Sequence, residues 1–174
     1  QARMGSKRLP GKAMLEISGK PLIGHIFDRL KKVKGLKNII LATTNDIKND
    51  VLVKYAKNND ILVYRHPHEN DIVGRIYKAF DVVKTDAFLK INSDCPLVDI
   101  KLLQEGVNIF IEGRNDFDLV TNKISKTFPE GYSYEIVSYR AIKWCQKNLI
   151  KPEDRELVML WIMKNKNIFP NVHS

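Results

Sequence analysis

The chain has 174 residues, with 29 Lys and Arg against 20 Asp and Glu, so its formal net charge is +9 at pH 7. The length suits one compact domain, and 44% hydrophobic with 28% charged residues excludes collagen-like, low-complexity and disordered chains. No apolar run approaches the ~20 residues that cross a bilayer, and the basic, Gly/Pro-punctuated start does not resemble a secretory signal. Two cysteines are too few for a disulfide framework, which indicates a reducing cytoplasm.

Hydrophobic periodicity predicts alternating helices and strands. In chain order we expect helix 21–30, strand 38–43, helix 46–57, strand 61–64, helix 71–83, strand 87–91, helix 100–112 and strand 119–122. This alternation predicts a parallel sheet with helices on both faces. The pattern then changes to a turn over 128–131, a strand over 134–137 and helices over 139–148 and 153–164. No repeat or linker divides the chain, so residues 1–174 are expected to form a single domain.

The first loop carries the strongest chemical signal. Between Arg3 and Lys12 it holds four cations, which include Lys7 and Arg8, two glycines and a serine, but no acidic residue. Glycines let backbone amides approach a phosphate, and the cations neutralise its charge. The loop matches neither the Walker A pattern nor the dinucleotide GxGxxG fingerprint. Two interpretations remain, a phosphate loop of another kind and a basic surface loop.

A second candidate site follows the strand predicted over 87–91. Asp94 stands at the carboxyl end of that strand, where a carboxylate can hold Mg²⁺ against a triphosphate or cap a turn. Asp99 is expected to cap the helix that begins near residue 100. Cys95 has no His or Lys close in sequence to activate its thiol, so we interpret it as a packing residue.

Other charged residues are less specific. Arg75 opens the third helix, where it either reaches a phosphate or base or lies in solvent. His66 and His68 lack further ligands at zinc-like spacing, and we expect them in a loop. Nucleic-acid binding is disfavoured, because the chain shows no helix-turn-helix, zinc pattern or aromatic-rich basic strand. Lysines outside the first loop are scattered as on a solvated surface.

Six collinear blocks carry a family resemblance: QARMGSKRLPGK at 1–12, LATTN at 41–45, DIVGR at 71–75, NSDCPL at 92–97, FPEG at 128–131 with Glu135, and DRE at 154–156. They resemble the cytidylyltransferase family that activates acidic sugars. The spore-coat polysaccharide biosynthesis protein F type is most similar, and acylneuraminate and 3-deoxy-manno-octulosonate cytidylyltransferases are more distant.

The resemblance implies an α/β fold, a Rossmann-like αβα sandwich of the nucleotide-diphospho-sugar transferase type with a mixed, mostly parallel sheet. It implies a nucleotidyltransferase that transfers a nucleoside monophosphate from CTP to a sugar and releases pyrophosphate, for surface polysaccharide or glycan biosynthesis. The implied cofactor is Mg²⁺, and the implied location is the cytoplasm. The implied assembly is a homodimer, and neither nucleic acid nor a membrane is expected as a partner.

Residue roles follow by motif match. The resemblance implies that the triphosphate faces Arg3, Ser6, Arg8 and Lys12. It implies further nucleotide contacts from Ala2, Gly5, Arg75 and Asn92. Asp94 would hold the metal and act in catalysis with Arg3 and Lys12. The sugar would approach the segments that contain Glu135 and Arg155.

The sequence departs from the family pattern in several places. The family has a strand before the position of Gln1, and a strand with a second metal-binding aspartate beyond the position of Ser174, so we expect a chain truncated at both ends. Ser133 and Leu157 stand where the most similar branch has Asp and His. These two departures motivate an alternative, a catalytically silent nucleotide-binding homologue that acts as a regulatory or assembly subunit.

Overall fold

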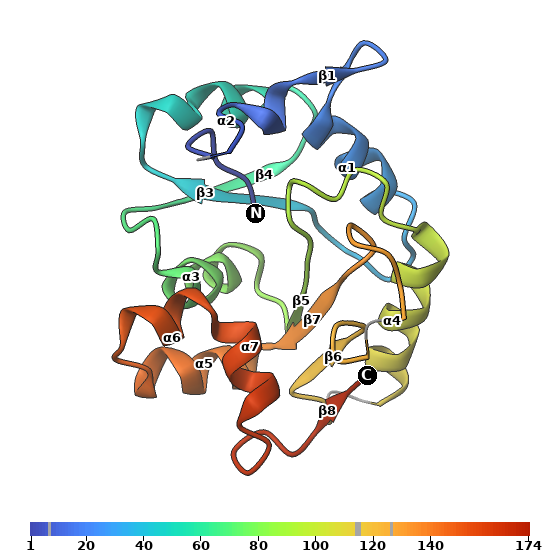
Figure 1. Ribbon diagram of the computed structural model, residues 1–174, viewed down its shortest axis with the longest axis vertical. Helices are drawn as coiled ribbons and strands as arrows, with labels where there is room; N and C mark the ends of the chain where they lie inside the picture. Colours follow the sequence, from blue (N-terminus) through green and yellow to red (C-terminus); the bar gives the residue numbers. More distant parts are fainter. Residues whose placement is uncertain (7, 114–115, 126) are drawn as a thin grey trace.

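The computed structural model describes residues 1–6, 8–113, 116–125 and 127–174, and it places helices on both sides of two sheets (Figure 1). One sheet pairs two parallel strands, β3 (Ile40–Thr44) and β4 (Leu62–His66). The other has the order β5 (Ala87–Lys90), β7 (Glu135–Ser138), β6 (Leu119–Thr121) and β8 (Val172–His173). A short antiparallel pair, β1 (Glu16–Ile17) and β2 (Lys20–Pro21), precedes the first helix.

The helices agree closely with the periodic segments. They are α1 (Leu22–Leu30), α2 (Asp50–Lys57), α3 (Ile72–Val83), α4 (Ile100–Glu112), α5 (Tyr139–Asn148), α6 (Pro152–Glu156) and α7 (Val158–Lys164), with the 3₁₀ turns η1 (Lys12–Met14) and η2 (Ile47–Asn49). As expected, the Asp99 side chain caps α4, accepting from the amide of Leu102 at 2.9 Å. The helix expected over 153–164 instead breaks at Leu157, whose backbone is not helical.

One strand makes the four-stranded sheet mixed. β7 runs antiparallel to both of its neighbours, β5 and β6. The reason is the connection between β6 and β7, in which the described residues form no crossover helix, and a parallel pair requires such a crossover. The four-stranded sheet is therefore mixed and the sheet of β3 and β4 is parallel, which agrees with the mixed sheet that the family resemblance implied. β1, β2 and β8 were missed because each has only two residues, too few to show a period.

Alternate residues of the central strands face two separate cores. Leu119 and Val137 pack into a cluster with residues of α3, α5 and α7, whereas Val120 and Ile136 pack into a cluster with residues of α1 and α4. This alternation follows from the two-residue period of a strand. Figure 1 shows the same division, with α4 on one side of β6 and β7 and α3, α5 and α7 on the other.

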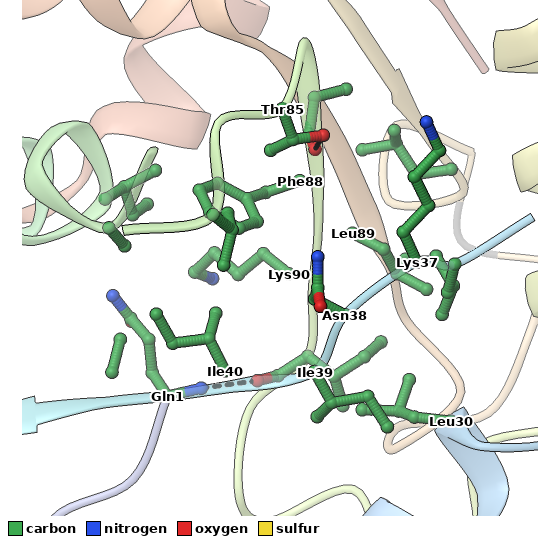
Figure 2. Close-up of a pocket in the computed structure, with 18 of the residues that line it drawn as sticks. Gln1, Leu30, Lys37, Asn38, Ile39, Ile40, Thr85, Phe88, Leu89 and Lys90 are labelled. Carbon is green, nitrogen blue, oxygen red and sulfur yellow. Dashed lines mark hydrogen bonds between the residues drawn. The ribbon is translucent and has the colours of Figure 1, made fainter. Parts of the chain in front are cut away.

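A cavity separates the two sheets. It has a volume of about 400 Å³ and lies between β3 and β5, with Ile40, Phe88 and Leu89 in its wall (Figure 2). Among the described residues, β3 pairs only with β4 and β5 only with β7, so the edges that face the cavity have no strand partner.

We predict that Gly106→Ala destabilises the protein, although alanine is the better helix former by about 1 kcal/mol. A Cβ at position 106 would overlap the ring of Tyr134, and that ring is 5% exposed and packed in the α1/α4 core. Overpacking of this kind costs about 1–3 kcal/mol. Chemical denaturation of the variant and of a Lys101→Ala control on the same helix measures the change in unfolding free energy. An unfolding free energy equal to or above the parent value would contradict the overlap.

Candidate functional site

The first loop begins between the carboxyl ends of β3 and β5. The amide of Ala2 donates to the carbonyl of Ala42 on β3 at 3.4 Å, and the amide of Ser93 donates to the carbonyl of Gln1 at 3.1 Å. The nitrogen of Gln1 also lies 2.9 Å from the carbonyl oxygen of Ile91, at one end of the cavity in Figure 2. Residues 1 and 2 thus join the two strand ends, and residues 3–12 extend from this junction.

Two contacts make the loop fold back on itself. Gly11 adopts a φ of +73°, which favours glycine, and its amide donates to the carbonyl of Met4 at 2.9 Å. The amide of Met4 in turn donates to Oδ1 of Asn49 at 2.8 Å. Asn49 is 2% exposed, and its side-chain nitrogen Nδ2 donates to Oγ1 of Thr44 at 2.7 Å.

Asn49 is a positioning residue that sequence reasoning missed. It connects the first loop to the end of β3, but it lies inside the segment interpreted as an ordinary helix. A signal was present, because Asn49 precedes Leu52 and Ala56 by three and seven positions and so shares their buried side. A polar residue in an apolar stripe indicates a buried hydrogen bond.

Lys12 and Asp94 meet across the site. Lys12 Nζ lies 2.8 Å from Asp94 Oδ2, and the Asp94 side chain remains 48% exposed. Burial alone would raise the pKa of Asp94, but the hydrogen bond and charge of Lys12 outweigh burial and lower this pKa. Asn92 is exposed in the same segment. Burial and the Asp94 carboxylate raise the pKa of the Cys95 thiol, consistent with a packing role.

A second pair of cations lies at the loop between β4 and α3. Arg3 forms an ion pair with Glu69. Arg75 is 4% exposed and donates to the carbonyls of His68 and Glu69, while its Nε has no hydrogen-bond partner among the described residues. Burial lowers the pKa of Arg75, and the charge of Arg3 adds to this effect. Arg75 is therefore a buried cation and not a solvated helix residue.

The remaining loop residues lie at the surface. Gly5 and Arg8 are exposed and Ser6 is half-buried, whereas Lys7 lies outside the described residues. Nothing lies within 4 Å of a Cβ built on Gly5, so the backbone here is open to a ligand.

The two acceptor candidates have different surroundings. Glu135 is 4% exposed, and its carboxylate binds Nζ of Lys90 at 2.7 Å and Nζ of Lys123 at 2.9 Å. Burial opposes ionisation of Glu135, but these lysines outweigh it and lower the pKa. Arg155 instead holds the side chain of Asp71, with Nε 2.9 Å from Oδ1.

Asp71 links Arg155 to a buried histidine. Its carboxylate accepts from the amide of Gly74 at 3.0 Å at the start of α3 and lies 3.2 Å from Nε2 of His66. His66 is the last residue of β4 and is 6% exposed, so the expectation of a loop residue was wrong. The network fixes the start of the helix that carries Arg75.

The arrangement offers cations and two exposed carboxylates, Asp94 and Glu69, to a ligand. Within the described residues, no group of three or more His, Cys, Asp or Glu side chains could hold a metal ion. No helix in this part of the chain has the length and apolar character needed to cross a membrane.

Comparison with known proteins gives a consistent result. A model of the cytidylyltransferase family matches residues 1–138. An uncharacterized protein of Methanocaldococcus jannaschii is 32% identical over 169 residues, which cover 97% of this chain and 67% of that protein. The 3-deoxy-manno-octulosonate cytidylyltransferase 2 of Hydrogenovibrio crunogenus is 34% identical over 98 residues, 56% of this chain and 40% of that protein. The 8-amino-3,8-dideoxy-manno-octulosonate cytidylyltransferase of Shewanella pealeana is 33% identical over 125 residues, 69% of this chain and 49% of that protein. The chain thus spans half or less of the length of these two cytidylyltransferases.

Solved structures show the same fold. A cytidylyltransferase from Leptospira borgpetersenii superimposes with a TM-score of 0.91 at 29% identity, over 98% of this chain and 71% of that one. A CMP:2-keto-3-deoxy-manno-octonic acid synthetase complexed with CTP gives a TM-score of 0.72 at 18% identity, over 99% of this chain and 85% of that one. At that identity the second likeness supports the fold alone.

We predict that Asn49→Ala lowers the unfolding free energy by about 1–3 kcal/mol, because the half-buried amide of Met4 loses its acceptor. Denaturant unfolding measures the change, and Asn58→Ala, which alters an exposed asparagine after α2, is the matched control. Equal stability of the two variants would show that Asn49 does not hold the loop.

We also predict that stability falls as the pH drops below about 6.5. Burial lowers the pKa of His66 in the folded protein, although Asp71 opposes this effect. The unfolded chain, with its ordinary histidine pKa, therefore takes up a proton at a higher pH than the folded chain does. The unfolding free energy, measured between pH 7 and 5, should fall less steeply with decreasing pH in His66→Gln than in the parent protein. In His68→Gln it should fall as steeply as in the parent. An unchanged pH dependence in His66→Gln contradicts the assignment to His66.

Proposed function

This chain belongs to the cytidylyltransferase family, and from that premise we propose that it transfers a cytidylyl group from CTP to a sugar for surface polysaccharide or glycan biosynthesis. The observation that carries the proposal is the convergence of Arg3, Lys12 and Arg75 with Asp94 around the ends of β3, β4 and β5. The cations suit a triphosphate, and the carboxylate suits a divalent metal.

The reaction needs positioning and charge neutralisation more than covalent chemistry. An oxygen of the sugar attacks the α-phosphorus of CTP, the bond from that phosphorus to the oxygen bridging the β-phosphate breaks, and pyrophosphate leaves. We propose that Arg3, Arg8 and Lys12 balance the negative charge on the departing phosphates and that the neutral hydroxyl of Ser6 donates a hydrogen bond to them. Lys12 would exchange its present partner, Asp94, for a phosphate oxygen.

We propose Mg²⁺ as the cofactor, held by Asp94. The residues fit such an ion, because Asp94 offers a half-exposed carboxylate of low pKa, and Mg²⁺ is commonly bound by one or two carboxylates plus substrate phosphates. When bound, the ion would supply further positive charge to the phosphates.

The nucleotide would also contact the backbone near Ala2 and Gly5 and the side chains of Arg75 and Asn92. Nε of Arg75, which has no partner within the part of the chain that the structure describes, supports this proposal, since a buried donor usually has an acceptor. We propose Arg155, first considered for the acceptor, as a positioning residue for Asp71 and α3.

Assays of the full-length polypeptide test the function. With CTP, Mg²⁺ and 3-deoxy-manno-octulosonate or its 8-amino-8-deoxy analogue, we predict pyrophosphate release that Asp94→Asn reduces by about 10²–10³ in kcat, as for loss of one preorganised electrostatic group. Lys12→Ala should lower kcat and raise the KM for CTP, whereas Lys32→Ala, an exposed lysine beyond α1, should change neither.

The outcome also separates the two candidate functions. Failure to release pyrophosphate from any nucleoside triphosphate with a panel of sugars would contradict the enzyme. If CTP still binds and the double variant Ser133→Asp, Leu157→His gains activity, the catalytically silent subunit is the correct interpretation. An active parent protein excludes that alternative.

A further inference from the structure

Three strand ends bring two lysines and one glutamate together. Glu135 is the first residue of β7, and it pairs in register with Lys90, the last residue of β5, and with Thr121, the last residue of β6. Lys123 follows Thr121 by two positions. Because β7 runs antiparallel to its neighbours, its beginning lies at the carboxyl ends of β5 and β6, the edge that also leads to Asp94.

The cluster carries more positive than negative charge. Oε2 of Glu135 binds Lys90 at 2.7 Å and Oε1 binds Lys123 at 2.9 Å, so both carboxylate oxygens are taken. Two ammonium groups share one carboxylate, which leaves one positive charge without a balancing anion within the cluster. An anion that reaches the cluster from solvent would therefore balance this charge.

Exposure distinguishes the two lysines. The Lys90 side chain is 13% exposed and also donates to Oδ1 of Asn92 at 3.2 Å, which connects it to the segment of Asp94. The Lys123 side chain is 35% exposed. Only Lys123 therefore combines a fixed ammonium group with access from solvent. Glu135, whose side chain is 5% exposed and covered by two lysines, is poorly placed to contact a ligand itself.

We propose that Lys123 binds an anionic group of the acceptor, a carboxylate or a phosphate, and that Glu135 is the positioning residue that holds Lys123 in place. The inference rests on the proposed function and deepens it, because it assigns the acceptor side of the site to a lysine that the sequence motifs did not include. Lys90 binds the second carboxylate oxygen of Glu135 and also donates to Asn92, so it connects Glu135 to the segment of Asp94.

Binding measurements on the full-length polypeptide test the proposal. With Mg²⁺ and a non-hydrolysable CTP analogue present, the probes are 3-deoxy-manno-octulosonate for a carboxylate, mannose 1-phosphate for a phosphate and mannose as the uncharged control. We expect one anionic probe to bind at least tenfold more weakly to Lys123→Ala and to Glu135→Gln. The affinity for the CTP analogue should stay within twofold, and Lys54→Ala, an exposed lysine on α2, should match the parent.

A conservative variant separates positioning from a structural role. Glu135→Asp keeps a negative charge beside the lysines, so it should restore part of the affinity for the anionic probe that Glu135→Gln loses, whereas loss of folded protein would reduce binding of the anionic probe and of the CTP analogue alike. Equal affinity of Lys123→Ala and the parent for both anionic probes overturns the proposal, and so does failure of both probes to bind while the CTP analogue binds. Binding of an anionic probe through Lys123 without binding of the analogue would instead contradict the proposed function.

Discussion

The site depends on the backbone hydrogen bonds of residues 1 and 2. Ala2 is bound to the end of β3, and Gln1 is bound to the segment after β5, so one dipeptide joins the ends of two strands that do not pair with each other. The cationic loop leaves this junction on one side, and the segment of Asp94 leaves it on the other. The contact between Lys12 and Asp94 is therefore a consequence of where these few amides and carbonyls are bound.

Carboxylates of the protein pair with the cations that a nucleotide and an acceptor would use. Arg3 is paired with Glu69, Lys12 with Asp94, and Lys90 and Lys123 with Glu135. These pairs are not equivalent. Exposed pairs such as Arg3 with Glu69 contribute little to stability and exchange readily for a ligand, whereas the Glu135 cluster is buried and serves to fix geometry. The 29 lysines and arginines therefore divide into exchangeable cations, fixed cations and a lysine-rich surface.

Much of this fold could be predicted from the sequence, because α1, α3, α4 and α5 show strong helical periodicity and β3, β4 and β5 are compact apolar runs. The first loop and Asp94 were recognisable from local composition. The direction of β7 was not predictable from periodicity, since it depends on a connection without a helix. Asn49, Lys90 and Lys123 were missed for a related reason: their importance comes from the register of distant strands and from a loop that folds back, which no local pattern records.

The cavity between β3 and β5 has a mechanical consequence. Strands in a continuous sheet are held at a fixed spacing by their ladder of hydrogen bonds, but these two strands are joined by the amides at residues 1, 2 and 93 and by packed helices. The end of β3, where Ala2 and with it the first loop are bound, is therefore held to the segment after β5 by few direct hydrogen bonds. The spacing between Arg3 in the first loop and Asp94 after β5 therefore depends on this small set of contacts, and a group bound in the cavity would add to them.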